Sequence, residues 1–487
     1  MANFVQLYKS TDQNALPLFG AAGSLIALLN AYLVNGLPSG ISVTSITKSG
    51  TTATVTVSSA NGLYFQTGQW VTISGATGGD GSDYNGTFKI TSTGATTFTY
   101  TMGGTPGANA AGTLLASLLQ PITSITRGGA GNLTATVTLT NPDTSLQTGQ
   151  YVTISGCTST GASQYNITAK ITVISTTSFS YTVGSDPGAN ASGSPVYTRA
   201  PLGWTLPYSA GTNSQTYRSA DSSSNQFYLQ VIDNAATAGA GKEAQIYGAE
   251  VMSADQTVTS GRFPTSVQFA SGLCWRKSTT ADSTTARAWT LIGDDRTFYL
   301  VMVTGDAVSA GYHGGGFGYF IPFKSGDAYN TFIAGGVVFN NSASTSVLSG
   351  LMNNCGPGAI QTVGFFLPRL YTQTGTAVNG QMGAPFNANL AGFGSAQVNA
   401  QNVLAYPNPD DSGLYMFQPC VIDSANALRG RVPGVFAHMH NVVPVFQNYD
   451  QITGVTGLSG VTLTNLVTCG YSASVGQMLF DTFGPWT

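Results

Sequence analysis

The chain has 487 residues, and only 37 of them are charged, 17 Lys and Arg against 20 Asp and Glu. This is 8% of the chain, where about 25% is usual for soluble domains. A net charge of −3 without a basic stripe excludes direct nucleic-acid binding, which needs several neutralised phosphates. An ordinary hydrophobic fraction of 42% excludes general disorder, and 61 glycines with only two glutamates favour strands over helices.

The first 36 residues predict an extended start and one short amphipathic helix. Ser24 is the expected N-cap, and Asn35-Gly36 is the expected C-terminal stop. The apolar stretch 25–34 is shorter than the about 20 residues that span a bilayer, and no signal-peptide cleavage site is evident. No membrane span is predicted, and the helix needs a partner for the apolar positions at helical spacing, Leu25, Leu28, Leu29 and Tyr32.

An internal repeat follows, because residues 66–75 (QTGQWVTISG) recur as 147–156 (QTGQYVTISG) with an offset of 81. Alternation of apolar and polar residues predicts strands in both copies. We expect two tandem small β-barrel or Ig-like modules at 41–118 and 119–198. Trp70 and Tyr151 occupy matching positions and are expected in the module cores rather than as sugar-binding platforms.

The rest of the chain predicts further strands. The run 296–303 is apolar and β-branched enough for a central strand, and Asp294-Asp295 before it is typical of a hairpin turn. The prediction is a mainly β chain with a β-sandwich or jelly-roll-like core, built from 1–36 plus 199–487, into which the modules are inserted. A subdivision of this core near residue 345 is left open.

Two histidine motifs were candidates for chemistry. His313-Gly314-Gly315-Gly316 is similar to the oxyanion-hole loop of lipases, but no serine lies in a G-x-S-x-G setting, so a glycine-rich turn is predicted. His438-Met439-His440 has the spacing that places two imidazoles on one face of a strand. A hydrogen-bonded pair is the favoured interpretation; His438 and His440 are the metal candidates, and no metal or cofactor is predicted.

Acidic residues give no clear catalytic site. Asp80 and Asp83 lie in a glycine-rich turn that could begin a calcium loop, but the second copy has Gly161 and Gln164 there, so turn acids are predicted. Glycan hydrolysis needs two carboxyl groups with different pKa values. Nothing in the sequence distinguishes a pair among the remaining candidates, and no enzyme is predicted: Glu243, Glu250, Asp410, Asp411 and Asp423.

Six blocks of the chain carry a resemblance to known proteins: 7–12, 20–25, the Gly203-Trp204 block, 298–300, 323–329 and 428–434. Together they resemble a family of tailed-bacteriophage virion structural proteins. The resemblance covers residues 1–36 and 199–487. The repeats resemble small β-modules of phage proteins that take their name from a half-domain of ubiquitin-activating enzymes, and no ubiquitin chemistry is implied.

The resemblance implies a structural component of the virion, present in many copies in the neck or tail as a collar or baseplate protein with projecting modules. The alternatives are a capsid decoration protein, a receptor-binding or glycan-binding adhesin and, last, a tailspike glycan hydrolase. The expected partners are other copies of the chain and other virion proteins, with host-surface glycan as a further candidate. The expected location is the virion, assembled in the host cytoplasm.

Overall fold

The computed structural model describes most of the chain, and it is mainly β with few helices. The described residues are 4–209, 213–234, 242–280, 283–305, 312–336, 364–383, 404–405, 407–438, 440–441, 447–455, 458, 461–471 and 474–486. The predicted fold class is confirmed, since the strands form several sheets with half-barrel and near-barrel shapes. The subdivision considered near residue 345 lies outside the described residues.

The chain divides into two compact units, which are described separately. The core unit holds residues 1–7, 18–26 and 202–487, and the module unit holds residues 8–17 and 27–201. The predicted core range was 1–36 plus 199–487. The contacts within the chain instead assign part of residues 1–36, together with residues 199–201, to the module unit. Residues 8–17 and 27–36 group with the modules that follow them.

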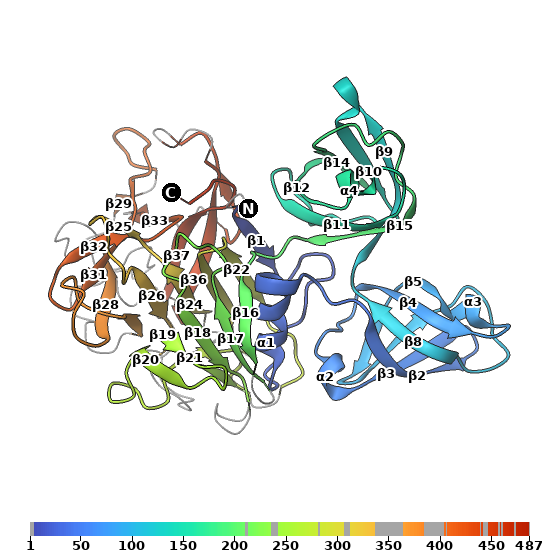
Figure 1. The fold of residues 1–487 in the computed structure, drawn as a ribbon, viewed down its shortest axis with the longest axis horizontal. Coiled ribbons are helices and arrows are strands. Elements are labelled where there is room, and N and C mark those ends of the chain that lie inside the picture. Colours follow the sequence, from blue (N-terminus) through green and yellow to red (C-terminus); the bar gives the residue numbers. More distant parts are fainter. Residues whose placement is uncertain are drawn as a thin grey trace. The chain divides into compact units, whose positions relative to one another are not determined.

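The two modules have the same strand order (Figure 1). The first runs β5-β4-β8-β2-β3-β7-β6 and the second runs β12-β11-β15-β9-β10-β14-β13. Their strands are β2 (Ile41–Ser49), β3 (Thr52–Val57), β4 (Trp70–Thr77), β5 (Gly86–Lys89), β6 (Thr91–Gly94), β7 (Thr97–Thr101) and β8 (Ala111–Ser117), then β9 (Gln120–Gly128), β10 (Thr134–Leu139), β11 (Tyr151–Cys157), β12 (Thr168–Lys170), β13 (Thr172–Ser175), β14 (Ser178–Thr182) and β15 (Gly193–Arg199).

Matching tyrosines hold equivalent loops in the two modules. Tyr84, at the end of the short helix α3 (Gly81–Tyr84), donates its hydroxyl to the Ala108 carbonyl at 2.5 Å. Tyr165, at the end of α4 (Ala162–Tyr165), donates to the Ala189 carbonyl at 2.6 Å. Both rings are buried, so each hydroxyl obtains the hydrogen bond that burial requires. The remaining short helices of this unit are α2 (Ser59–Gly62) and the 3-10 turn η2 (Ala130–Asn132).

Residues 8–17 join both modules through side-chain hydrogen bonds. Asn14 is buried, and its amide accepts from the Trp70 N–H at 2.8 Å and donates to the Trp70 carbonyl at 2.6 Å. The neighbouring Gln13 N–H donates to Ser145 Oγ of the second module at 3.0 Å. These bonds satisfy backbone groups that strand pairing leaves unpaired, which is why this segment groups with the modules rather than with the core unit.

The predicted helix forms, but its N-terminus is capped differently. α1 (Ser24–Leu29) continues as the π-helical η1 (Asn30–Asn35), and Gly36 ends it with a φ of 78°. The Leu25 N–H donates to Oδ2 of Asp233 at 2.8 Å, whereas Ser24 Oγ accepts from the Phe19 N–H. The Ser24 cap was therefore wrong, while burial of the four apolar positions is confirmed at Leu25, Leu28, Leu29 and Tyr32.

The core unit contains two larger sheets. One follows the path β16-β17-β18-β19-β20, with β21 paired to β19. The other follows β25-β32-β31-β28-β27-β26-β24-β36-β37-β33-β30, joined by β1, β22, β23 and β35; β29 pairs with β34 separately. The bounds are β1 (Gln6–Lys9), β16 (Thr205–Ser209), β17 (Ser214–Arg218), β18 (Tyr228–Ile232), β19 (Glu243–Met252), β20 (Val258–Phe263), β21 (Leu273–Arg276), β22 (Trp289–Gly293), β23 (Thr297–Val303), β24 (Tyr312–Tyr319), β25 (Ile321–Pro322), β26 (Thr331–Ala334), β27 (Phe365–Leu367), β28 (Val378–Gly383), β29 (Leu404–Ala405), β30 (Met416–Phe417), β31 (Cys420–Asp423), β32 (Leu428–Arg431), β33 (Val435–His438), β34 (His440–Asn441), β35 (Gln451–Ile452), β36 (Leu463–Tyr471) and β37 (Ser474–Asp481).

Buried aromatic side chains from the two sheets meet in the interior. Phe263 of β20 stacks on Phe317 of β24, with ring centroids 6.3 Å apart, and Trp275 of β21 meets Phe298 of β23 edge-on at 5.8 Å. Such pairs add about 0.5–1.5 kcal/mol each beyond the burial of their area. The predicted hairpin at Asp294-Asp295 is confirmed, because β22 and β23 pair on either side of it and β23 also pairs with β24.

Candidate functional site

A buried ion pair joins two of the sequence blocks that carry the family resemblance. Arg429 Nη2 contacts both carboxylate oxygens of Asp327, at 2.7 and 3.0 Å, and Nε donates at 3.0 Å. The same guanidinium donates to the Arg369 carbonyl at 2.8 Å and lies 3.7 Å from Asp423. Burial removes both partners from water, so this bidentate geometry is needed to offset the desolvation of the charges.

A second buried pair anchors the block at residues 20–25. The Lys277 ammonium contacts Asp233 Oδ1 and donates to the Ala21 carbonyl at 2.7 Å. Asp233 also accepts the Leu25 N–H at the start of α1. Burial raises the pKa of Asp233, and the Lys277 charge partly offsets that rise. The pair thus fixes the helix N-terminus against the six-stranded sheet rather than forming an accessible acid–base site.

The remaining blocks of the core unit also meet through buried contacts. The Trp204 indole donates to the Asp294 carbonyl at 2.8 Å and packs edge-on against Phe298 at 5.2 Å. The Tyr299 hydroxyl donates to the Pro433 carbonyl at 2.8 Å. These blocks lie far apart in the sequence, and their contacts help to hold the core unit together.

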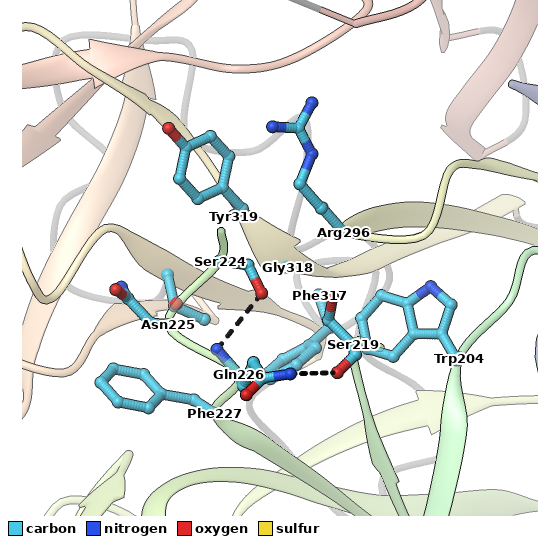
Figure 2. Close-up of a pocket in the computed structure, with 11 residues that line it drawn as sticks. Trp204, Ser219, Ser224, Asn225, Gln226, Phe227, Arg296, Phe317, Gly318 and Tyr319 are labelled. Atoms are coloured by element: carbon cyan, nitrogen blue, oxygen red, sulfur yellow. Dashed lines mark hydrogen bonds between the residues drawn. The ribbon is translucent and has the colours of Figure 1, made fainter. Parts of the chain in front are cut away.

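A shallow depression, partly open to solvent, lies in the core unit (Figure 2). Arg296 is its charged lining residue, and its guanidinium lies over the Tyr319 ring at 5.2 Å. That guanidinium is already engaged, since it lies 3.7 Å from Asp221 and donates to the Trp486 carbonyl at 2.8 Å. The other lining residues are Trp204, Ser219, Ser224, Asn225, Gln226, Phe227, Phe317, Gly318, Tyr319 and Thr331.

Asp294, beside the pocket, is a buried acid with a raised pKa. Burial raises its pKa to about 6, although Oδ1 accepts the N–H groups of Arg296 and Thr297 at 2.8 and 2.7 Å. These bonds close the hairpin between β22 and β23. The carboxyl group therefore has a turn-forming role and does not line the pocket.

The glycine-rich run at His313 is a strand, so the predicted turn was wrong. Residues 313–316 lie within β24. A Cβ on Gly315 would lie 2.1 Å from Nε1 of Trp275, so the missing side chain makes room for the indole. Burial, aided by the nearby charge of Arg276, lowers the pKa of His313 to about 3. His313 is thus a neutral interior residue across the physiological range.

The two metal candidates lie in different strands. His438 is buried at the end of β33, which pairs with β30, and the backbone of His440 begins β34, which pairs with β29. The side chain of His440 lies outside the described residues. Across the described part of the chain, no group of three or more His, Cys, Asp or Glu side chains could hold a metal ion.

The aspartates of the first module serve its loops. Asp80 Oδ2 accepts the N–H groups of Gly107 and Ala108 at 2.8 and 3.0 Å. The matching residue of the second module, Gly161, has a φ of 78°, and a Cβ there would lie 2.1 Å from the Pro187 carbonyl oxygen. Asp80 is half-buried and holds the loop that it faces, which agrees with the predicted turn acids.

The other acidic candidates are spread over different structural contacts. Glu250 forms a bidentate pair with Arg369, both contacts at 2.8 Å, and Glu243 lies buried 3.8 Å from Arg276. Asp411 accepts from its own turn, including the Gly413 N–H at 2.8 Å. None of the candidates lines the described pocket: Glu243, Glu250, Asp410, Asp411 and Asp423.

Trp70 and Tyr151 do not lie in the module cores, contrary to the prediction. Both are half-buried, whereas their strand neighbours Val71 and Val152 are fully buried. Alternation along β4 and β11 turns the valines inward and the aromatic rings toward the outer face of each sheet. The sequence pattern did not reveal this, because the adjacent residues Trp70 and Val71 are both large and apolar, as are Tyr151 and Val152, and either member of each pair could face the core.

No protein-family model matches the chain, and no curated protein matches it. Within the described residues, no helix is long and apolar enough to cross a membrane.

Proposed function

We propose that the chain is a structural component of a tailed-phage virion, present in many copies in the neck or tail. The observation that carries the proposal is where the few charged side chains lie. The chain has 37 charged residues, and twelve of those in the described part of the structure are buried, although such residues are seldom buried in proteins. They are Asp143, Arg199, Asp233, Glu243, Arg276, Lys277, Arg287, Asp294, Asp327, Asp423, Arg429 and Asp481.

Because these charged side chains are buried, the surface of a chain that is already poor in charge carries even fewer charges. Charged residues are depleted where subunits bury each other, because desolvating them is costly. The resemblance blocks support the same role, since their described contacts are packing contacts: Arg429 with Asp327, Tyr299 with Pro433, and Lys277 with the Ala21 carbonyl. The modules project as accessory domains in this proposal.

An epitope tag in purified virions tests the proposal. Gly79 in the first module is a suitable insertion point, because it is exposed and a Cβ there would meet nothing within 4 Å. We expect several gold labels per particle at the neck or tail by electron microscopy. Label over the head would support the decoration alternative, and washed particles without label would contradict a virion role.

A further inference from the structure

The outer faces of the two modules carry the same aromatic–lysine pair. In the first module Trp70 of β4 lies directly opposite Lys89 of β5, and in the second Tyr151 of β11 lies directly opposite Lys170 of β12. Residues directly opposite in an antiparallel pair share a face, with Cβ atoms about 5 Å apart. The aromatic residues are half-buried and both lysines are exposed. We call these the aromatic–lysine pairs.

A hydroxyl pair lies beside each aromatic–lysine pair. Thr72 Oγ1 and Thr87 Oγ1 are 2.9 Å apart in the first module, and Thr153 and Thr168 have the same separation in the second. These threonines are two residues from the aromatic–lysine pairs along the same strands, so they share the outer face. Each face therefore presents a ring, an ammonium group and two hydroxyls.

The charge on this face is positive. The modules contain four aspartates, and none of them lies in β4, β5, β11 or β12. Three are engaged elsewhere: Asp80 by the Gly107 and Ala108 N–H groups, Asp143 by the Tyr197 hydroxyl, and Asp186 by Arg127. A ligand that complements the face is consequently anionic, with an apolar surface for the ring.

We propose that the aromatic–lysine pairs bind an acidic polysaccharide. The indole or phenol ring stacks on the C–H face of a sugar, the lysine ammonium meets a uronic-acid carboxylate, and the threonine hydroxyls exchange hydrogen bonds with sugar hydroxyls. One such exposed contact is weak, but two sites on one chain raise the overall affinity through effective concentration. The inference goes beyond the structural role and does not depend on it, because the isolated chain is tested.

Electrophoresis of the full chain through native gels containing polysaccharide tests the inference. We expect polygalacturonate to retard the protein at lower concentration than neutral dextran does. Trp70→Ala with Tyr151→Ala should require at least tenfold more polygalacturonate for equal retardation. Lys89→Gln with Lys170→Gln should remove the preference for polygalacturonate over dextran.

Single variants provide the matched control. Lys89→Gln should weaken retardation by polygalacturonate about twofold or more, whereas Lys48→Gln, the same charge change in β2, should leave it unchanged. Unchanged thermal unfolding would show that the outer-face variants fold. Equal behaviour of the Lys48 and Lys89 variants, or no retardation by polygalacturonate, alginate and hyaluronate, would overturn the inference and leave the lysines as protection of the terminal strands against edge pairing.

Discussion

Arg429 is the residue whose loss should cost the core unit most. It is buried, makes a bidentate contact with Asp327 and donates to the Arg369 carbonyl. Arg429→Met leaves the carboxylate of Asp327 buried without its counter-ion, and breaking such a pair costs about 3–5 kcal/mol. Urea unfolding should show this loss. Arg431→Met, two residues away and exposed, should change the unfolding free energy by less than about 0.5 kcal/mol.

Equal effects of the two arginine substitutions would contradict this assignment. Sequence blocks 323–329 and 428–434 contain the two partners of this ion pair, but nothing in the sequence indicates that they contact each other. The contact spans 102 residues and depends on β25 lying beside β32.

Asp294 should make stability depend on pH. Its pKa is about 6 in the folded protein, above the ordinary 3.8, so the folded state binds a proton more tightly than the unfolded state. The unfolding free energy contributed by this group is highest below pH 4 and falls as the pH rises toward 6 and above, by up to about 3 kcal/mol. Asp294→Asn should therefore stabilise the protein at pH 8 and have little effect at pH 4.

Asp221 is the control for this prediction. Like Asp294, it lies close to Arg296, with its carboxylate 3.7 Å from the guanidinium. Burial raises its pKa, but hydrogen bonds from the Ser223 N–H and hydroxyl and the charge of Arg296 outweigh burial and lower it. Asp221→Asn should destabilise the protein at pH 8, the opposite sign. Urea unfolding at pH 4 and pH 8 measures both, and stabilisation by both substitutions at pH 8 would count against the argument.

At the scale of elements, local pattern predicted strands well and their surroundings less well. Repetition identified both modules, but the predicted inward face of β4 and β11 was wrong, because Val71 and Val152 are buried where Trp70 and Tyr151 were expected. The N-cap of α1 failed because its acceptor, Asp233, lies 208 residues from Leu25 in sequence. The glycine run at 313–316 is a strand because β24 pairs with β23 and β26, and Gly315 lacks a side chain where Trp275 packs; no local pattern records these distant neighbours.

Asp80 and Trp70 likewise show what a local sequence pattern can predict and what depends on the rest of the fold. The glycine-rich stretch correctly indicated that Asp80 lies in a loop, but its hydrogen-bond partners, the Gly107 and Ala108 N–H groups, belong to another loop 27 and 28 residues away. Alternation along β4 places either Trp70 or Val71 in the core. Both residues are apolar, so the sequence does not decide between them. The outer-face position of Trp70 therefore needed the register between β4 and β5, which only the folded structure supplies.

At the scale of the whole molecule, a surface poor in charge predicts how copies associate. We expect the purified chain to form an oligomer whose mass, measured by light scattering, is the same in 0.05 M and 1 M NaCl. Salt shortens the screening length from above 10 Å to about 3 Å over this range, which weakens contacts between exposed charges. Several charge pairs among the described residues are internal, such as Lys277 with Asp233 and Arg429 with Asp327, and are shielded from salt.

Two results of this measurement would separate the arguments. Dissociation in 1 M NaCl would mean that exposed charges hold the copies together, against the apolar and hydrogen-bonded contacts expected from the burial of charge. A monomer at every concentration and salt would instead count against the multi-copy role itself. Dilution at constant salt is the control, because it lowers association of any kind without changing screening, and an oligomer sensitive to dilution but not to salt is the expected outcome.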